Sequence, residues 1–351
     1  MDFALSEEQT ALAEAERGWL VKNDPLAVRR STIDDGPARI SSNALAHVAE
    51  SGLIGLLTSE MGGCHVDLLV LSEEHGRAGS AVPVAELAVT CQILEQIGHQ
   101  GLPEAASGES VTLPVLASLA SPSLSAEIDG ARLRLHGATA PATGLPDAAQ
   151  LLVAATTEQG DDVVAVVPAE SVSTRALDTL DLTRAWSVVD IDLELDSSAW
   201  SPAPSGTVAR LRDQLATYRA VDALGAASRL LELTVDYAGQ RTQFDRVIGS
   251  FQAIKHHCAD MALAVEASRA SLWAAAVALD GDDARARTRA VAAGAAFVGE
   301  ATRTTAQTAL QVHGGIGFTW EHDVHLYIRR IKVDELLDGS VGFHRRRLVS
   351  A

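Results

Sequence analysis

The sequence predicts an α+β protein with a helical N-terminal domain, a central antiparallel β domain and a C-terminal four-helix bundle. Three observations support this fold class. Helical periodicity recurs up to about residue 110, short β-branched runs fill the middle of the chain, and long Ala- and Leu-rich stretches follow. We therefore expect domains at residues 1–111, 112–200 and 201–351.

The N-terminal domain begins with a helix-start signal. Ser6 and Gln9 have the spacing of a capping box, and Glu7 and Glu8 supply negative charge in the expected first turn. Further helical stretches follow, separated by glycine breaks such as MGGCHVD (61–67).

Four short runs predict strands in the central domain. They alternate or are β-branched, and Gly, Pro and Asp turns separate them, as in antiparallel sheets. The runs are ARLRLHG (131–137), AQLLVAA (149–155), DDVVAVVP (161–168) and WSVVDIDLEL (186–195). The last residue of the third run, Pro168, is a natural strand end. The stretch SPAPSGT (201–207) has the composition of a linker.

The C-terminal region predicts three long helices, at residues 208–241, 254–281 and 285–315. HRRRL (344–348) forms a basic cluster near the end of the chain. We expect it to be a solvated tail, or to contact a ligand phosphate or a partner subunit.

Composition excludes several classes of protein. The net charge of −18 argues against a nucleic-acid binder, which needs a basic face. Cys64, Cys91 and Cys258 form no CxxC pair, a pattern typical of reduced thiols rather than of disulfides or a zinc site. The N-terminus lacks the apolar core of a secretory signal, and no stretch is expected to span a membrane. We expect a cytoplasmic protein.

We expect no metal site. His256, His257 and Asp260 are close in sequence, but adjacent histidines on a helix point about 100° apart. A third ligand for His256 and Asp260 is not evident.

A glycine cluster, QVHGGIGF (311–318), follows the last long helical run. A dinucleotide-binding fingerprint would have to follow a strand, so this interpretation fails on context. Two compatible interpretations stay open: a helix C-cap, and a turn whose exposed N–H groups meet a phosphate. The flanking His313, His322 and His325 could pack around helix ends or contact the same ligand.

Taken with a second stretch, this cluster resembles a known family. RTQFDRVIGSFQAI (241–254) and QVHGGIGF are similar to two motifs of the acyl-CoA dehydrogenase family, R-x-Q-F-G-x-P-I-x-x-F-Q-A-I and Q-x-x-G-G-x-G-F. The likeness extends along the whole chain, through MDFALSEEQ, SEMGG, EEHGRAG and IDGARLRLHG.

The resemblance implies the helix–β–helix fold of that family and FAD as cofactor. In the family, the two motifs contact the ADP half of an FAD that a neighbouring subunit largely holds. The cofactor-binding residues carried over in this way are Arg241, Gln243, Phe244, Ile248, Phe251, Gln252, Gln311, Gly314, Gly315 and Gly317. Asp245 and Val247 depart from the motif, where the family has glycine and proline.

The catalytic part of the resemblance is incomplete. The family removes the α proton of an acyl-CoA with a glutamate, and Asp338, one methylene shorter, stands at its position in the commonest subgroup. Glu335 does not align with the base, and Leu215 stands at the base position of another subgroup. The loop T-E-P-x-x-G-S-D and the strand W-I-T-N, which line the flavin ring in catalytic members, are not recognisable in this chain.

These features are typical of the shorter subunit of bacterial α2β2 acyl-CoA dehydrogenases, several of which act on CoA thioesters of steroid side chains. We expect the chain to complete the FAD site of a longer homologous partner and to lack the base itself. The substrate would be an acyl-CoA, and an electron-accepting flavoprotein could be a further partner. Two alternatives stay open: a complete homo-oligomeric enzyme with Asp338 as base, and an assembly subunit that binds no nucleotide.

Overall fold

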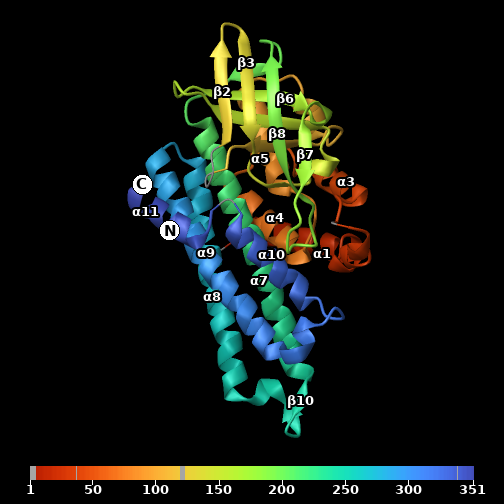
Figure 1. Cartoon of the computed structure of the whole chain (residues 1–351). Helices are drawn as coiled ribbons and strands as arrows, with labels where there is room; N and C mark the ends of the chain where they lie inside the picture. The colour runs from red at the N-terminus through yellow and green to blue at the C-terminus, as the bar shows by residue number, and fades with distance from the viewer. Residues whose placement is uncertain (1–4, 37, 119–122, 338) are drawn as a thin grey trace.

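The computed structural model describes residues 5–36, 38–118, 123–337 and 339–351. Helices come first, strands follow, and long helices complete the chain (Figure 1). The α+β fold class predicted from the sequence is confirmed. Helices give way to strands between Ala106 and Thr112, and helix resumes at Thr207.

The N-terminal helices pack around one buried helix. Their bounds are α1 (Glu7–Asn23), α2 (Leu26–Arg30), η1 (Ile33–Asp35), α3 (Ser42–Glu50), α4 (His65–Ala78), α5 (Val84–Gln96) and α6 (Leu102–Ala106). The predicted capping box is confirmed, because Ser6 and Gln9 exchange two hydrogen bonds of 3.1 Å. α4 is buried along most of its length and packs against α1, α7 and α8.

The central strands form two sheets. The first has the order β1 (Thr112–Leu116), β5 (Gln150–Thr156), β6 (Asp162–Pro168), β9 (Trp200–Pro202). The second has the order β2 (Ser123–Asp129), β3 (Arg132–Ala138), β8 (Trp186–Leu195), β4 (Ala142–Thr143), with β7 (Ser173–Ala176) also paired to β8.

The expected antiparallel pairing is confirmed for most strands, and two details differ from the expectations. β1 pairs β5 in parallel, because the chain builds β2 and β3 of the other sheet before it returns to β1. The expected linker begins inside a strand, since Ser201 and Pro202 belong to β9 at the edge of the first sheet. An edge strand is where a sheet tolerates proline.

The C-terminal region is a bundle of long helices, and the three that were predicted are confirmed. The bounds are α7 (Thr207–Gln240), α8 (Gln252–Asp280), α9 (Ala284–His313), α10 (Val324–Leu336) and α11 (Val341–Ser350). A small hairpin, β10 (Thr242–Gln243) and β11 (Arg246–Val247), leads into η4 (Ile248–Ser250), and η5 (Gly314–Phe318) follows α9. The hairpin lies at the end of the bundle farthest from the sheets (Figure 1).

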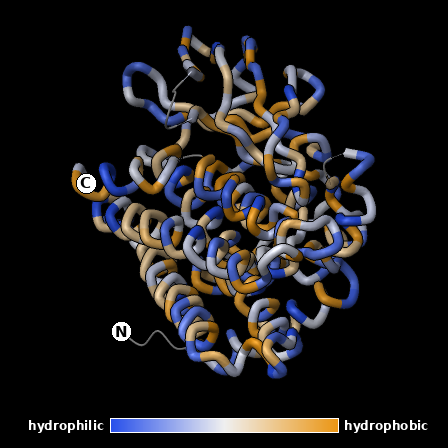
Figure 2. The backbone as a smooth tube through the Cα atoms, turned by 60° about the horizontal axis from the view of Figure 1, so that its bottom comes forward, coloured by the Kyte–Doolittle hydropathy of each residue, from blue (hydrophilic) through white to orange (hydrophobic). Residues whose placement is uncertain are grey.

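The expectation that no stretch could span a membrane was wrong for one helix by length and composition alone. α8 contains an 18-residue window with a mean hydropathy of 1.3, of which 39% is buried. α8 packs side by side with α7 and α9, although apolar side chains such as Leu263 stay exposed. Hydrophobic and hydrophilic residues are mixed along the helices of the molecule (Figure 2).

The basic cluster at residues 344–348 is only partly a solvated tail, because Arg345 and Arg346 are exposed whereas the other residues pack against the bundle. Arg347 donates to the buried carboxylate of Asp213 at 2.5 Å, and Arg287 donates to the same carboxylate at 3.0 Å. His344 is buried. The last helix is therefore clamped onto α7 and α9.

Candidate functional site

The two sequence motifs meet at the far end of the bundle. Tyr237 lies one turn before Arg241 on α7, and His313 directly precedes the glycine loop at the end of α9. Their rings stack with centroids 4.6 Å apart, and His322 packs edge-on against His313 at 4.8 Å. Segments more than 70 residues apart in sequence therefore form one site.

His313 is a packing residue in this site. Its side chain is buried, and its Nδ1 is hydrogen-bonded to the Ala309 carbonyl at 2.8 Å. Burial lowers its pKa, so the ring is held neutral. Sequence analysis did not single out Tyr237. The available signal was an aromatic residue one helical turn ahead of the arginine motif.

The hairpin presents a strained two-residue turn. Thr242 pairs with Val247 and Gln243 with Arg246, so Phe244 and Asp245 form the loop, with φ angles of 52° and 60°. Positive φ at both positions is the geometry of a type I′ turn. Aspartate tolerates this geometry, but a bulky residue such as phenylalanine is held there at about 1–3 kcal/mol of strain.

This turn holds its aromatic side chain outward. Phe244 is 86% exposed, and its ring lies edge-on to Phe251 at 6.2 Å. The Arg246 guanidinium lies 4.0 Å from the centre of the Phe251 ring. Arg246 and Arg241 are both exposed, so the hairpin carries two cationic side chains to the surface. Sequence analysis missed Arg246, which fills an unspecified position of the motif.

The structure leaves most of the predicted cofactor residues open to solvent. Those exposed are Arg241, Gln243, Phe244, Gln252, Gln311, Gly314 and Gly315. Ile248 and Phe251 are partly buried, and Gly317 is buried. Ile316, Phe318 and Trp320 are exposed apolar side chains in the same loop region. Exposed apolar groups beside polar ones are typical of a surface that another molecule covers.

The three glycines differ in their structural roles. Gly314 ends α9 with a φ of 62°, which confirms the predicted C-cap. A Cβ on Gly317 would meet Leu310 Cδ1 at 3.0 Å, so this glycine serves internal packing. A Cβ on Gly315 would meet no atom within 4 Å, and its φ is not positive. Any requirement for glycine at 315 therefore comes from outside the chain.

The residues at this end of the bundle fit the ADP half of FAD. Arg241 and Arg246 supply cationic donors for pyrophosphate oxygens, and Phe244 supplies an apolar wall. The surface beside Gly315 is open, which allows a ligand to approach the backbone.

The predicted catalytic position, Asp338, lies outside the described residues. Close by, Glu335 accepts a hydrogen bond from Lys332 at 2.8 Å. On α7, Leu215 is buried and lines a hollow of about 20 Å³. The two nearby acids of α7, Asp213 and Asp222, are both bound by arginines. None of these described carboxylates is free to act as a base.

The junction of the three parts of the chain is held by a buried charge network. Arg184 donates to Asp181 at 2.7 Å and to Asp334 at 2.8 Å, and it contacts Asp222 at 3.1 Å. Arg330 binds Asp222 through two hydrogen bonds of 2.6 and 2.7 Å. β8 and the loop before it, α7 and α10 are thereby joined.

The network shifts the pKa values of two of its acids in opposite directions. Burial opposes charge on Asp222, but Arg184 and Arg330 outweigh this effect and lower its pKa. Burial, together with the charge of Asp222, raises the pKa of Asp334 well above the ordinary value. The raised pKa favours the protonated form of Asp334, and in that form two guanidinium groups face two carboxylates.

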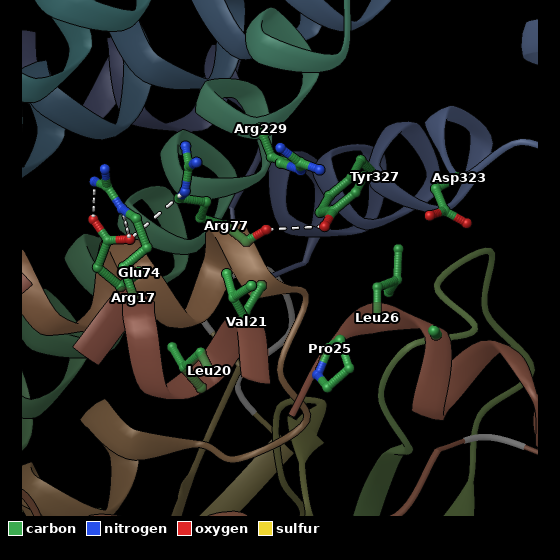
Figure 3. A pocket seen from close by; sticks show the side chains of 12 residues that line it. Arg17, Leu20, Val21, Pro25, Leu26, Glu74, Arg77, Arg229, Asp323 and Tyr327 are labelled. Carbon is green, nitrogen blue, oxygen red and sulfur yellow. Dashed lines mark hydrogen bonds and ion pairs between the residues drawn. The ribbon is translucent and has the colours of Figure 1, made fainter. Parts of the chain in front are cut away.

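A hollow of about 300 Å³ lies between α1, α2, α4, α7 and α10, away from the motif residues (Figure 3). Its arginines already have partners within the chain. Arg17 donates to Glu74 at 2.6 Å, Arg229 donates to Glu232 at 2.9 Å, and Arg77 also pairs with Glu232. This hollow therefore offers no free charge to a ligand.

Comparison with known proteins identifies the family. Over 328 residues the chain is 31% identical to acyl-CoA dehydrogenase IpdE2 of Mycobacterium tuberculosis, covering 92% of this chain and 91% of that protein. The chain belongs to the acyl-CoA dehydrogenase family. Residues 213–351 also match the model of the acyl-CoA dehydrogenase C-terminal domain. Acyl-CoA dehydrogenases are FAD-dependent oxidoreductases, so FAD is the cofactor of the family, as expected.

Two solved structures share the whole acyl-CoA dehydrogenase fold of this chain. The ChsE4–ChsE5 complex of M. tuberculosis is 25% identical with a TM-score of 0.87, covering 100% of this chain and 98% of that one. The Tcur3481–Tcur3483 steroid ACAD, in its G363A variant, is 26% identical with a TM-score of 0.87, covering 98% and 97%. Both relatives consist of two differently named proteins.

Among the described residues, no group of three or more His, Cys, Asp or Glu side chains is placed to hold a metal ion.

Proposed function

We propose that this chain is the shorter subunit of a heteromeric acyl-CoA dehydrogenase and completes the ADP half of an FAD held mainly by a longer homologous subunit. One observation carries this proposal: the motif residues Arg241, Phe244 and Gly315 are exposed at one end of the bundle, around the stacked Tyr237 and His313. Exposed motif residues suit an FAD held by another subunit, and the flavin-ring motifs that are not recognisable in this chain favour a different, longer chain as that subunit.

In this family the bound flavin supplies the hydride acceptor for α,β-dehydrogenation of an acyl-CoA thioester. The residues of this chain would bind and orient. Arg241 and Arg246 would neutralise the pyrophosphate, Phe244 would cover an apolar face of the nucleotide, and Gly315 would let the backbone approach. The α-proton base would come from the partner.

The relatives support the choice of partner and substrate. The ChsE4–ChsE5 complex and the Tcur3481–Tcur3483 pair favour an α2β2 assembly with a longer homologue. The Tcur pair is a steroid ACAD, which favours the CoA thioester of a steroid side chain as substrate. We place the complex in the cytoplasm, where Cys64, Cys91 and Cys258, all unpaired in the structure, stay reduced.

The test is the FAD content of purified assemblies. We expect the adjacent coding region to encode a longer relative with the family glutamate, and co-expression to give one FAD per pair of unlike chains. Arg241→Ala should weaken FAD retention of the pair about ten- to hundredfold, because a charge-assisted contact is worth ~1.5–3 kcal/mol. The exposed Arg132→Ala serves as the matched control and should leave FAD retention unchanged.

The alternatives predict other outcomes. A complete homo-oligomeric enzyme would carry one FAD per chain, and Asp338→Asn would abolish its activity. An assembly subunit without nucleotide would leave the FAD content of the pair unchanged in every Arg241 variant. Turnover of an acyl-CoA by the purified single chain would overturn the proposal.

A further inference from the structure

The place where the three parts of the chain meet is nearly solid. Small-molecule sites prefer such junctions and occupy ~300–1,000 Å³. Here the hollows have volumes of about 20, 40 and 20 Å³, and all three are lined by Arg219 of α7. They lie between α4, α5, β1, β4, β8, α7 and α10 and reach the middle of α9 and the start of α11. Each holds about one water, whose share of liquid volume is ~30 Å³.

An aromatic side chain fills the junction. Trp186, at the start of β8, is only 2% exposed. Two guanidinium groups lie over its indole ring, Arg184 at 5.0 Å and Arg219 at 4.9 Å from the ring centre. The indole N–H donates to Asp181 at 3.2 Å. We call Arg184, Trp186 and Arg219 the Trp186 cluster.

The charge network fixes the Trp186 cluster in place. Arg184 is bound by Asp181, Asp222 and Asp334, and burial removes all four groups from water. Moving Arg184 aside to admit a ligand would leave buried carboxylates without their cation. Breaking a buried pair in this way is strongly destabilising, because it leaves a buried charge without compensation. A ligand therefore cannot displace the Trp186 cluster by rotating one side chain.

We infer that the Trp186 cluster leaves no room for a flavin ring at this junction, so that the fold closes there without an isoalloxazine. The inference rests on the proposed function and deepens it, because it gives a structural reason why the partner, and not this chain, would bind the flavin ring. Arg219 Nη1 has no hydrogen-bond partner among the described residues, and the adjoining hollows admit a water there.

The experiment uses the full-length chain alone and lumiflavin, which is the ring system without the ADP half. The wild-type chain should not bind lumiflavin and should show no rise in Tm with it. Trp186→Ala should open a cavity that binds lumiflavin at least tenfold more tightly than the wild type. Trp273→Ala, at a buried tryptophan of α8, is the matched control and should not bind it.

Two results would overturn the inference. One is saturable binding of lumiflavin to the wild-type chain, and the other is a folded Trp186→Ala chain that binds no better than the wild type. If Trp186→Ala does not fold, Trp186→Leu replaces it, and if neither folds the wild-type result decides. Arg241→Ala should not alter lumiflavin binding, although it weakens FAD retention of the complex. The inference and the proposed function can therefore fail separately.

Discussion

Arginines dominate two regions of this molecule, in opposite ways. At the junction, Arg184 is buried among three carboxylates, and Arg330 is buried and bound by the carboxylate of Asp222. At the hairpin end, Arg241 and Arg246 are exposed, and Arg246 contacts the Phe251 ring. A guanidinium whose partners lie inside the chain stabilises the fold, whereas one that faces solvent is available to an anion from elsewhere. The junction is therefore a stabilising region of the fold, and the hairpin end is a surface that is open to a ligand.

The largest effect should come from removing a buried cation. Arg330→Ala leaves Asp222 without its two hydrogen bonds, so we expect the free energy of unfolding to fall by ~3–5 kcal/mol. Arg132→Ala, at the exposed pair with Glu194, is the matched control and should cost less than ~1 kcal/mol. Urea unfolding measures both. Equal losses in the two variants would mean that the junction is not the stabilising region.

Acid should lower the stability of the folded chain through two buried histidines. Burial lowers the pKa of His65 from 6.5 to about 4, and burial with Arg347 lowers that of His344 to about 4. Between pH 6.5 and 4 the unfolded chain binds protons that the folded chain refuses, so unfolding becomes easier as pH falls. Each histidine should lower the free energy of unfolding by about 3 kcal/mol between pH 6.5 and pH 4.

Urea unfolding across this pH window tests the prediction. His65→Gln should flatten the pH dependence, because the unfolded state of this variant gains one proton fewer. His136→Gln, at an exposed strand position, should leave the slope unchanged. A wild-type stability that does not change between pH 6.5 and 4 would contradict the assignment.

The sequence predicted some parts of this molecule and not others. Local signals sufficed for the long helices and for the Ser6–Gln9 cap, because helix periodicity and capping act over a few residues. The parallel pairing of β1 with β5 and the strand at Ser201 depend on distant partners, which no local pattern encodes. The class of candidate site followed from the two motifs.

The geometry of the site did not follow from the motifs. Only the fold brings Tyr237 onto His313 and so places the two motifs side by side. The charge network joins Arg184 to Asp334 across 150 residues, and neither residue belongs to a motif. Such pairs are set by tertiary packing, and each residue alone is typical of an exposed helix or turn position.

A substitution in the glycine loop should affect FAD retention and not the stability of the fold. In Gly315→Ala the new methyl meets no atom of the chain, so Tm should stay constant. FAD retention by the assembled pair should weaken about tenfold, or ~1.4 kcal/mol, because the methyl group projects toward the proposed nucleotide. Gly18→Ala, at another open position on α1, is the control and should retain FAD fully. Unchanged retention in Gly315→Ala would move the nucleotide away from this loop.

The smallest effect should come from the hairpin turn. Asp245→Gly restores the residue type that the family motif has here, and it removes a negative charge near the pyrophosphate contacts. FAD retention should improve about two- to fivefold, since an exposed charge at short range is worth ~1 kcal/mol or less. Asp245→Asn removes the charge and keeps a residue tolerant of positive φ, so it separates charge from backbone strain. Tighter retention in the glycine variant alone would assign the effect to strain.

The two-residue turn has a further consequence for the assembly proposed above. A loop with both φ angles positive leaves Phe244 little backbone freedom, so in that proposal its ring already projects before the partner binds. Immobilising a side chain and its loop at an interface ordinarily costs ~0.5–1.5 kcal/mol per residue. Because folding has done this ordering in advance, the subunits meet with their contact pre-shaped, and a looser loop of the same composition should associate more slowly.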